Sequence, residues 1–235
     1  MFCEKCGKEL NKDAKFCMGC GAPNPEFNEL DVTDNVQEET IISQENNDLT
    51  VDIVETVKPI WTFCEWEESF RNFYAERIIR DNLFNNKMNF QLLSENEKEL
   101  LAIIFFQKKT DTNDVNEWIL KNWEKFDEEQ KNSVRICSDF LETMESKVHA
   151  LMNDDEIKLS LFVSLKKGEG SVLFKSMWQK MKNQGYKNMY LWTDCECNWQ
   201  WYIKNGFTLV EESVYEKFST ETEKYKTYVF KKAIE

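Results

Sequence analysis

Four cysteines near the N-terminus have the type and spacing of a metal site. Cys3 and Cys6 form one C-x2-C pair, and Cys17 and Cys20 form a second pair after ten intervening residues. Each pair turns the chain tightly, so that two thiolates point at one tetrahedral centre, and four sulfurs complete the ligand set that structural zinc prefers. The spacing therefore predicts one structural zinc ion per chain, with no coordination position left open for catalysis.

A glycine-rich turn is the second pattern that could do chemistry. Gly168-Glu169-Gly170-Ser171 follows an apolar run and begins a segment with apolar residues at helical spacing. A strand–glycine–helix junction of this kind exposes backbone N–H groups, and the helix dipole favours an anion there. Ordinary strand-to-helix turns contain glycines at the same spacing, so the motif alone leaves both interpretations open.

The periodicity of apolar residues predicts a mixed α/β domain around this turn. Strands are expected over 60–64, 89–93, 100–107, 157–165, 189–193, 207–212 and 225–231. Helices are expected over 67–84, 171–183 and 198–204, with two more inside 114–153. The strand at 157–165 leads directly into the glycine turn, which places that turn at one end of the sheet.

Composition divides the chain into three parts. Residues 1–24 form the metal module, 25–58 an acidic flexible linker, and 59–235 the globular domain. The linker contains ten acidic residues and one basic residue, and it has no aromatic residue after Phe27. Such a segment cannot bury enough apolar surface to offset its ordering entropy. Alternating apolar residues over 49–57 also fit a short strand, so this boundary is soft.

Charge and hydropathy exclude some classes of partner. The linker carries −9 of the formal charge of −13, so the chain lacks the clustered cations that non-specific nucleic-acid binding needs. The longest apolar run, 100–106, is too short to cross a bilayer, and we expect no membrane partner. The first residues, Met1-Phe2-Cys3, do not begin a secretory signal, which favours a cytoplasmic protein with reduced thiols.

Three patterns between 157 and 207 resemble the GCN5-related N-acetyltransferase (GNAT) superfamily. The first is the strand–Gly-x-Gly–helix run through Gly168 and Gly170. The second is GYKNMYLWT over 185–193, similar to the strand that splays from its neighbour in that fold. The third is NWQWYIKNGF over 198–207, which resembles the helix and turn N-x-x-(A)-x-x-[FY]-Y-x-x-x-G-F of the family. The resemblance covers about 157–232, and the expected hairpin at 89–107 fits the strands before it.

The resemblance implies a mixed α/β sheet of GNAT-like acyl-CoA transferase fold, with a helical insertion at about 108–155 and a zinc ribbon in front. It implies an N-acetyltransferase that moves an acetyl group from acetyl-CoA to an amine by direct transfer, with the pantetheine arm between two parting strands. Tyr202 matches the proton donor to the leaving thiolate, and a backbone N–H around 162–164 matches the oxyanion donor. The implied coenzyme-binding residues are Val163, Lys166, Lys167, Gly168, Glu169, Gly170, Ser171 and Asn198.

Two positions depart from the family pattern. Leu165 stands where the family has Gln or Arg, with Lys166 and Lys167 nearby as alternative cations, and the insertion at 108–155 replaces a short turn. Tyr202 also fits a second interpretation, as an aromatic residue that packs with Trp199 and Trp201 on a short helix.

The sequence identifies no general base. Glu156, Asp194 and Glu196 qualify by location, although each also fits a solvated carboxylate. An acyl-cysteine route through Cys195 or Cys197 would need a nearby base. The single histidine, His149, is expected on the surface of the helical insertion.

Two functions from different classes remain open at this stage. One is the acetyltransferase, which Tyr202 and the two glycines favour and whose acceptor amine the sequence does not specify. The other is a binding protein, in which the zinc ribbon recruits a partner and the GNAT-like domain is not catalytic, as Leu165 favours. Cations and anions nearly balance in the ribbon, so a protein partner is as plausible there as nucleic acid.

Overall fold

The computed structural model describes residues 41–42, 47–94 and 99–234, with side chains from Ile53 onward. The chain divides into two units, Met1–Glu39 and Thr40–Glu235. The predicted zinc ligands Cys3, Cys6, Cys17 and Cys20 lie outside the described residues, as does most of the expected linker.

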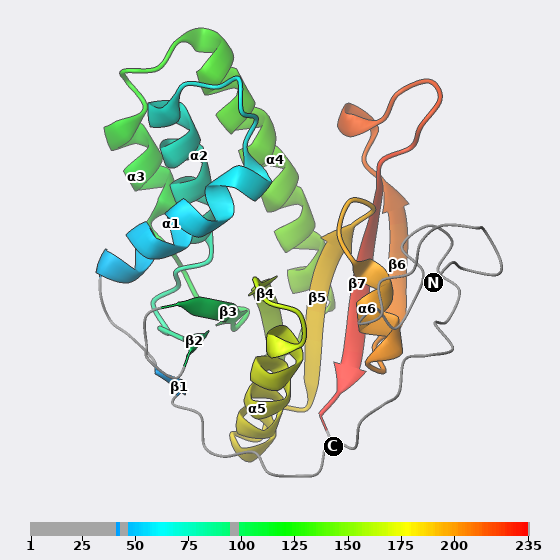
Figure 1. Cartoon of the computed structure of the whole chain (residues 1–235). Helices are drawn as coiled ribbons and strands as arrows, with labels where there is room; N and C mark the ends of the chain where they lie inside the picture. Colours follow the sequence, from blue (N-terminus) through cyan, green and yellow to red (C-terminus); the bar gives the residue numbers. More distant parts are fainter. Residues whose placement is uncertain (1–40, 43–46, 95–98, 235) are drawn as a thin grey trace, which may run out of the picture. The chain divides into compact units, whose positions relative to one another are not determined.

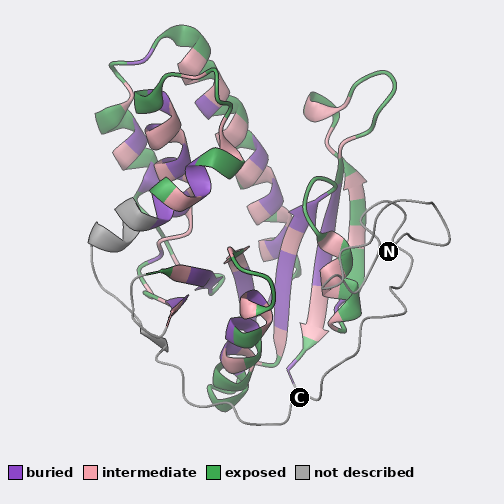
Figure 2. Ribbon diagram, in the orientation of Figure 1, coloured by how far each residue is buried: buried purple, intermediate pink, exposed green. Residues whose placement is uncertain are grey.

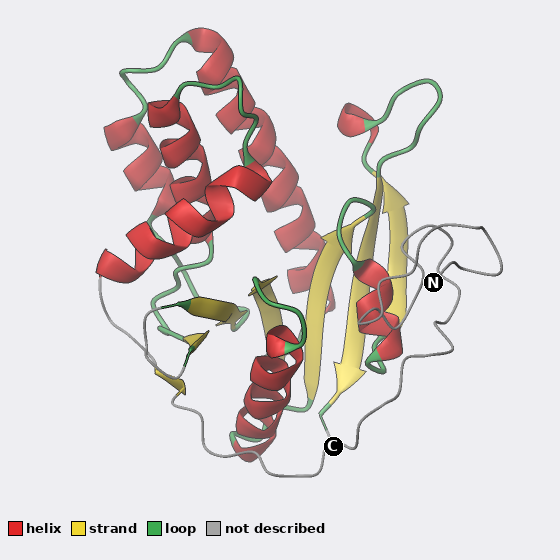
Figure 3. Ribbon diagram, in the orientation of Figure 1, coloured by secondary structure: helices red, strands yellow, loops and turns green. Residues whose placement is uncertain are grey.

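Seven strands of the described chain form one mixed sheet in the order β1-β2-β3-β4-β5-β7-β6 (Figure 3). Their bounds are β1 Ile41–Ile42, β2 Asn89–Leu93, β3 Leu100–Gln107, β4 Ile157–Ser164, β5 Asn188–Asp194, β6 Thr208–Val214 and β7 Lys226–Ala233. Only the β4–β5 pair is parallel, and every other neighbouring pair is antiparallel. Six of these strands match sequence-based expectations to within two residues, and β1 was not expected.

The central strands are buried on both faces, so their apolar residues divide between two cores. On β3, Ile104 and Phe106 join one core while Ile103 and Phe105 join the other, because successive side chains point to opposite faces. Both faces must therefore be covered by helices.

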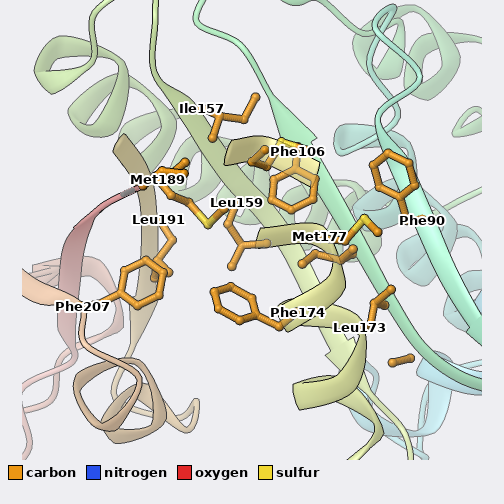
Figure 4. Close-up of a cluster of buried hydrophobic side chains, with 14 of the residues drawn as sticks. Phe90, Phe106, Ile157, Leu159, Leu173, Phe174, Met177, Met189, Leu191 and Phe207 are labelled. Carbon is orange, nitrogen blue, oxygen red and sulfur yellow. The ribbon is translucent and has the colours of Figure 1, made fainter. Parts of the chain in front are cut away.

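Helices α5 (Glu169–Asn183) and α6 (Trp199–Lys204) cover one face of the sheet, called here the α5 face. The buried side of α5 presents residues at helical spacing, Leu173, Phe174, Met177 and Met181. Figure 2 shows this buried stripe beside exposed residues on the same helix, and Figure 4 shows its side chains packed against strand residues such as Phe106 and Leu159.

Helices α1 (Asn47–Trp61), α2 (Glu68–Asp81) and α4 (Glu128–Leu151) cover the opposite face, called here the α4 face (Figure 1). Our expectation of a strand at 60–64 is wrong, because α1 extends to Trp61 and residues 62–67, which lead to α2, contain no strand. Helix α1 also occupies residues 47–58 of the expected linker and replaces the possible strand at 49–57. Ile53, Val54 and Val57 are spaced for one helical face and pack against β3, which outweighs the polar composition of the segment.

The insertion is helical, as expected. Helix α3 (Val115–Asn122) and the first turns of α4 pack with α2 in an aromatic cluster that contains Phe70, Phe73 and Phe126. A capping box begins α4, because the Asp127 carboxylate accepts from the backbone N–H of Gln130 and the Gln130 side chain accepts from that of Asp127. The insertion therefore extends the layer on the α4 face.

No helix within the described ranges combines the length and apolar character needed to cross a membrane.

Candidate functional site

Strands β4 and β5 pair for only two residues and then part, and this opening is called here the fork. Ile157 pairs with Met189 and Lys158 with Tyr190, and no later residue of β4 pairs with β5. A bulge in β4 at Ser160 bends the strand at this point, since Phe105 opposes Leu161 while Phe106 opposes Leu159. From 159 to 164, the edge of β4 that faces β5 thus has no strand partner among the described residues. Its backbone N–H groups are available to an extended ligand.

The glycine turn lies at the end of β4, where the fork is open. Gly168 has φ +94, and a Cβ added there would meet nothing within 4 Å. Gly170 is different, because an added Cβ would lie 2.6 Å from Cβ and Oγ of Ser164. The left-handed backbone at position 168 therefore favours glycine, and the space above the turn there is open. At position 170 glycine is needed because the helix packs closely on Ser164 of β4.

Several N–H groups at the start of α5 are already bonded within the turn. Gly170 donates to Ser164 Oγ at 3.1 Å, Glu169 to the carbonyl of Lys166 at 3.3 Å, and Ser171 to the carbonyl of Gly168 at 3.0 Å. The N–H groups of Lys166 and Gly168 have no partner in the described chain. An anion would therefore meet these two groups first.

The charged residues of the turn face solvent. Lys166, Lys167 and Ser164 are exposed, and Glu169 is half-buried at the first position of α5. Two free N–H groups, open space at Gly168 and two exposed lysines suit a phosphate group. The described residues therefore fit the pyrophosphate of coenzyme A, although Ser164 must release Gly170 before that N–H can contribute.

Two other residues that the resemblance implies for coenzyme binding, Val163 and Asn198, lie outside the glycine turn. The Val163 side chain packs against the cluster on the α4 face that contains Ile103, its partner on β3, so only its backbone faces the fork. Asn198 is the residue before α6, and its side chain does not cap that helix.

Tyr202 lies on α6, on the α5 face. Its ring contacts the rings of Phe207, Phe230 and Trp201, with centroids 5.6, 6.0 and 5.3 Å away, and its hydroxyl has no hydrogen-bond partner among the described residues. Burial raises the pKa of Tyr202 above its ordinary value of 10.0, with a smaller contribution from Cys197. The phenol therefore stays protonated at neutral pH and keeps a proton to donate.

Trp201 joins α6 to the fork. Its ring lies 5.6 Å from that of Phe162 on β4 and 5.3 Å from that of Phe174 on α5. Tyr202 therefore contacts the unpaired part of β4 only indirectly, through the ring of Trp201.

Two of the three carboxylates that the sequence offered as bases, Glu156 and Asp194, have structural partners, whereas Glu196 is exposed. Glu156 is 1% exposed, accepts from the N–H of Asn153 at 2.7 Å, and pairs with Lys231 at 3.4 Å. It joins the turn before β4 to β7 at the closed end of the fork. This burial contradicts the alternative of a solvated carboxylate.

Asp194 and the two cysteines after it also form a structural turn. Asp194 Oδ1 accepts from the N–H groups of Glu196 and Cys197 at 3.0 and 3.2 Å. Burial raises the pKa of Cys197 to about 11, so its thiol is not ionised at neutral pH. An acyl-cysteine route through Cys197 therefore has no thiolate to begin it. No group of possible metal ligands occurs in the described chain.

A polar cluster on the α4 face of the fork was missed by sequence reasoning. Lys158, which is fully buried, pairs with Glu145 of α4, and Trp192 of β5 donates to the same carboxylate at 2.8 Å. His149, one turn along α4, is half-buried toward this cluster rather than on the surface as expected. The available signal was a lysine inside an apolar strand, which requires a buried counter-ion.

A shallow surface depression occurs elsewhere on the sheet. It is lined by Asn188, Gly206, Thr208, Val210, Lys231, Lys232 and Ala233. Asn188 begins β5, so this depression lies at the closed end of the fork and does not include the glycine turn.

Comparison with known proteins assigns the two parts separately. Residues 2–24 match the family model of a zinc-ribbon domain. Among solved structures, a putative arylalkylamine N-acetyltransferase 7 from the yellow fever mosquito is similar with a TM-score of 0.51 and 9% identity, covering 81% of this chain and 85% of that one. The C-terminal condensation domain of Ebony in complex with β-alanyl-dopamine has a TM-score of 0.50 and 8% identity, covering 83% and 97%. The fold is that of the GNAT N-acetyltransferases.

At these identities the similarity concerns the GNAT fold alone. A search of curated proteins found no match. The activity of the chain must therefore be argued from its own residues.

Proposed function

We propose that the chain is an acyltransferase that moves an acetyl group from acetyl-CoA to an amine by direct transfer. The observation that carries this proposal is the fork, where the β4 edge from 159 to 164 has no strand partner within the described sheet and leads to a turn suited to an anion. A bound thioester supplies the activated acetyl group. The unpaired N–H groups of β4 supply hydrogen bonds to an extended pantetheine arm and to the thioester oxygen.

The turn holds the phosphate end of the coenzyme in this proposal. Lys166 and Gly168 offer free backbone N–H groups, Lys166 and Lys167 add positive charge, and Ser164 gives up Gly170 when the phosphate arrives. Glu169 and Ser171 sit at the first positions of α5, where the helix dipole favours an anion.

Tyr202 acts as the proton donor to the departing thiolate. Its raised pKa keeps the hydroxyl protonated, and α6 holds it on the same face as the coenzyme turn. A phenol within hydrogen-bond reach of a thiolate is a usable general acid.

A second candidate is a binding protein with a non-catalytic GNAT-like domain. It is favoured by Leu165, which supplies no polar group to the turn, and by the internal bonds of Gly170 and Ser171. In that case the zinc ribbon recruits a protein partner and the fork stays closed to coenzyme.

We assign one structural zinc ion to the ribbon, held by Cys3, Cys6, Cys17 and Cys20, as the family match at 2–24 supports. Zinc-binding thiolates must be reduced, which supports a cytoplasmic location. Metal analysis should find about one zinc per chain. Cys17→Ser should lose this zinc and Cys195→Ser should keep it, whereas zinc kept by Cys17→Ser refutes the four-sulfur assignment.

Calorimetric titration with acetyl-CoA separates the two functions. The enzyme should bind one equivalent, and Lys166→Glu should weaken binding by roughly tenfold or more, which corresponds to about 1.4 kcal/mol. Lys175→Glu is the matched control, because Lys175 is exposed on the body of α5 away from the turn. No binding at about 1 mM, the upper range of typical KM values, would leave the binding protein as the function.

A tyrosine variant then tests the chemistry. Tyr202→Phe should keep the affinity for acetyl-CoA and lower the rate of thiol release by about 10²-fold or more, as loss of a general acid does. An unchanged rate removes Tyr202 from the mechanism.

A further inference from the structure

Glu145 joins the two strands where the fork begins. Lys158, the last residue of β4 that pairs with β5, donates to Glu145 Oε2, and Trp192 of β5 donates to Oε1 at 2.8 Å. Trp192 lies two residues beyond the last paired residue of β5. The carboxylate is therefore held at the point where the two strands part, by one donor from each strand.

The side chain of Glu145 keeps access to solvent. It is 23% exposed, whereas Lys158 is fully buried and is held by Gln107 Oε1 at 2.8 Å in addition to Glu145. A carboxylate has about four acceptor positions, and its two protein donors leave some of them free. Glu145 can therefore receive a hydrogen bond from a ligand without losing its partners.

His149 lies beside this carboxylate with an unused nitrogen. Its Nε2 atom is buried, has no hydrogen-bond partner among the residues that the structure describes, and lies 3.8 Å from Glu145 Oε2. Burial, with a further contribution from the Lys158 ammonium, lowers the pKa of His149 below its ordinary value of 6.5. The imidazole is therefore neutral at neutral pH and able to take a proton.

Glu145 and His149 lie on one face of the sheet, and Tyr202 lies on the other. Helices α5 and α6, with Tyr202, share the core of the α5 face, whereas Trp192 shares the core of the α4 face with α4. A thioester in the fork would thus have the proposed acid on one face of the sheet and Glu145 on the other. An amine that attacks from the α4 face meets Glu145, and the sulfur leaves toward the α5 face.

We propose that Glu145 is the general base for the acceptor amine and that His149 carries the proton onward to solvent. This inference rests on the proposed acyl transfer. Glu145 takes one proton from the acceptor ammonium, the nitrogen lone pair attacks the thioester carbon, and the carbon–sulfur bond breaks. The thiolate takes the proton of Tyr202, and the second proton lost by the nitrogen restores that hydroxyl. The proton on Glu145 passes to His149 Nε2 and then to water, so that the reaction releases one proton.

Other charged groups lie near the pair. Lys158 of β4 pairs with Glu145, and both Lys158 and Lys109, before α3, oppose protonation of His149. Asp81 of α2 also interacts with Glu145, and burial raises the pKa of Asp81. The environment thus keeps His149 neutral before the reaction, the state that the relay needs.

Thiol release from acetyl-CoA tests the pair, with tyramine, spermidine or water alone as acceptor. Glu145→Gln should keep acetyl-CoA affinity and lower the rate by about 10²-fold or more, and His149→Gln should lower it less. Glu142→Gln is the matched control, since Glu142 is an exposed carboxylate one turn away on α4. No release by the wild-type chain contradicts the proposed function. Release that Glu145→Gln leaves unchanged overturns only the general base.

Nuclear magnetic resonance gives a readout that needs no turnover, because His149 is the only histidine in the chain. The nitrogen shifts should show an unprotonated Nε2 and titration below pH 6.5. Glu145→Gln should lower this pKa further, since the Glu145 charge raises it, and Glu142→Gln should not. A protonated Nε2 at neutral pH, or a titration that Glu145→Gln leaves unchanged, overturns the relay to His149.

Discussion

At the scale of single residues, burial decides which groups are ready for chemistry. Glu156 is buried with partners on every side, so its carboxylate joins the turn before β4 to the sheet. Glu145 keeps an accessible edge, and its neighbour His149 keeps an unused nitrogen. A glutamate therefore serves a structural role at the closed end of the fork, and another has a proposed chemical role where the strands part.

The lowered pKa of His149 predicts a pH dependence of stability. Below about pH 6.5 the unfolded chain binds a proton at His149 that the folded chain resists, so stability is present above this pH and is lost as the pH falls. Urea denaturation of the wild type and His149→Gln at several pH values from 7.5 to 5.5 isolates this contribution. As the pH falls, the free energy of unfolding of the wild type should decrease relative to that of His149→Gln. A pH-independent difference would show that the pKa is not lowered.

The sequence located the glycine turn, but it did not predict the hydrogen bonds that the N–H groups of the turn already make. Two glycines after an apolar run were sufficient to locate the loop. That Gly170 donates to Ser164 depends on where β4 ends relative to α5, which no local pattern encodes. The pairing of Lys158 with Glu145 was not predicted for a similar reason, because the two residues belong to β4 and α4, which only the fold brings together.

At the scale of elements, apolar periodicity in the sequence predicted the helices of the insertion but not helix α1. The two helices of the insertion were expected, but α1 was not, because a short run of apolar residues fits a strand and a helix alike. Contact of Ile53 and Val57 with β3 decides the case.

The two helices of the insertion begin differently, which gives a matched test of capping. Asp127 accepts from Gln130 at the start of α4, whereas Asp114 makes no side-chain capping bond at the start of α3. Asp127→Ala should lower the free energy of unfolding by about 1 kcal/mol, and Asp114→Ala by much less. Equal losses in urea denaturation would show that the capping box does not stabilise α4.

At the scale of the whole molecule, the proposed function depends on the one parallel pair in the described sheet. Helix α5 returns the chain so that β5 lies parallel to β4, and the bulge at Ser160 limits their pairing to two residues. The sequence resemblance predicted that two strands part, but the extent of pairing follows only from the assembled sheet. The coenzyme turn, Tyr202 and the Glu145 cluster all take their proposed roles from this opening.

Amide hydrogen exchange with and without acetyl-CoA tests the fork most directly. Bound coenzyme should slow exchange over 159–164 of β4 and over the turn at 165–170, because the free N–H groups there become bonded and covered. Strand β6 (Thr208–Val214) is the internal control, since it is a terminal strand of the described sheet and also has one edge without a strand partner there. We predict slower exchange at β4 and the turn with no change at β6. Unchanged exchange at β4, or an equal effect at β6, would contradict the assignment of the fork as the acyl-CoA site.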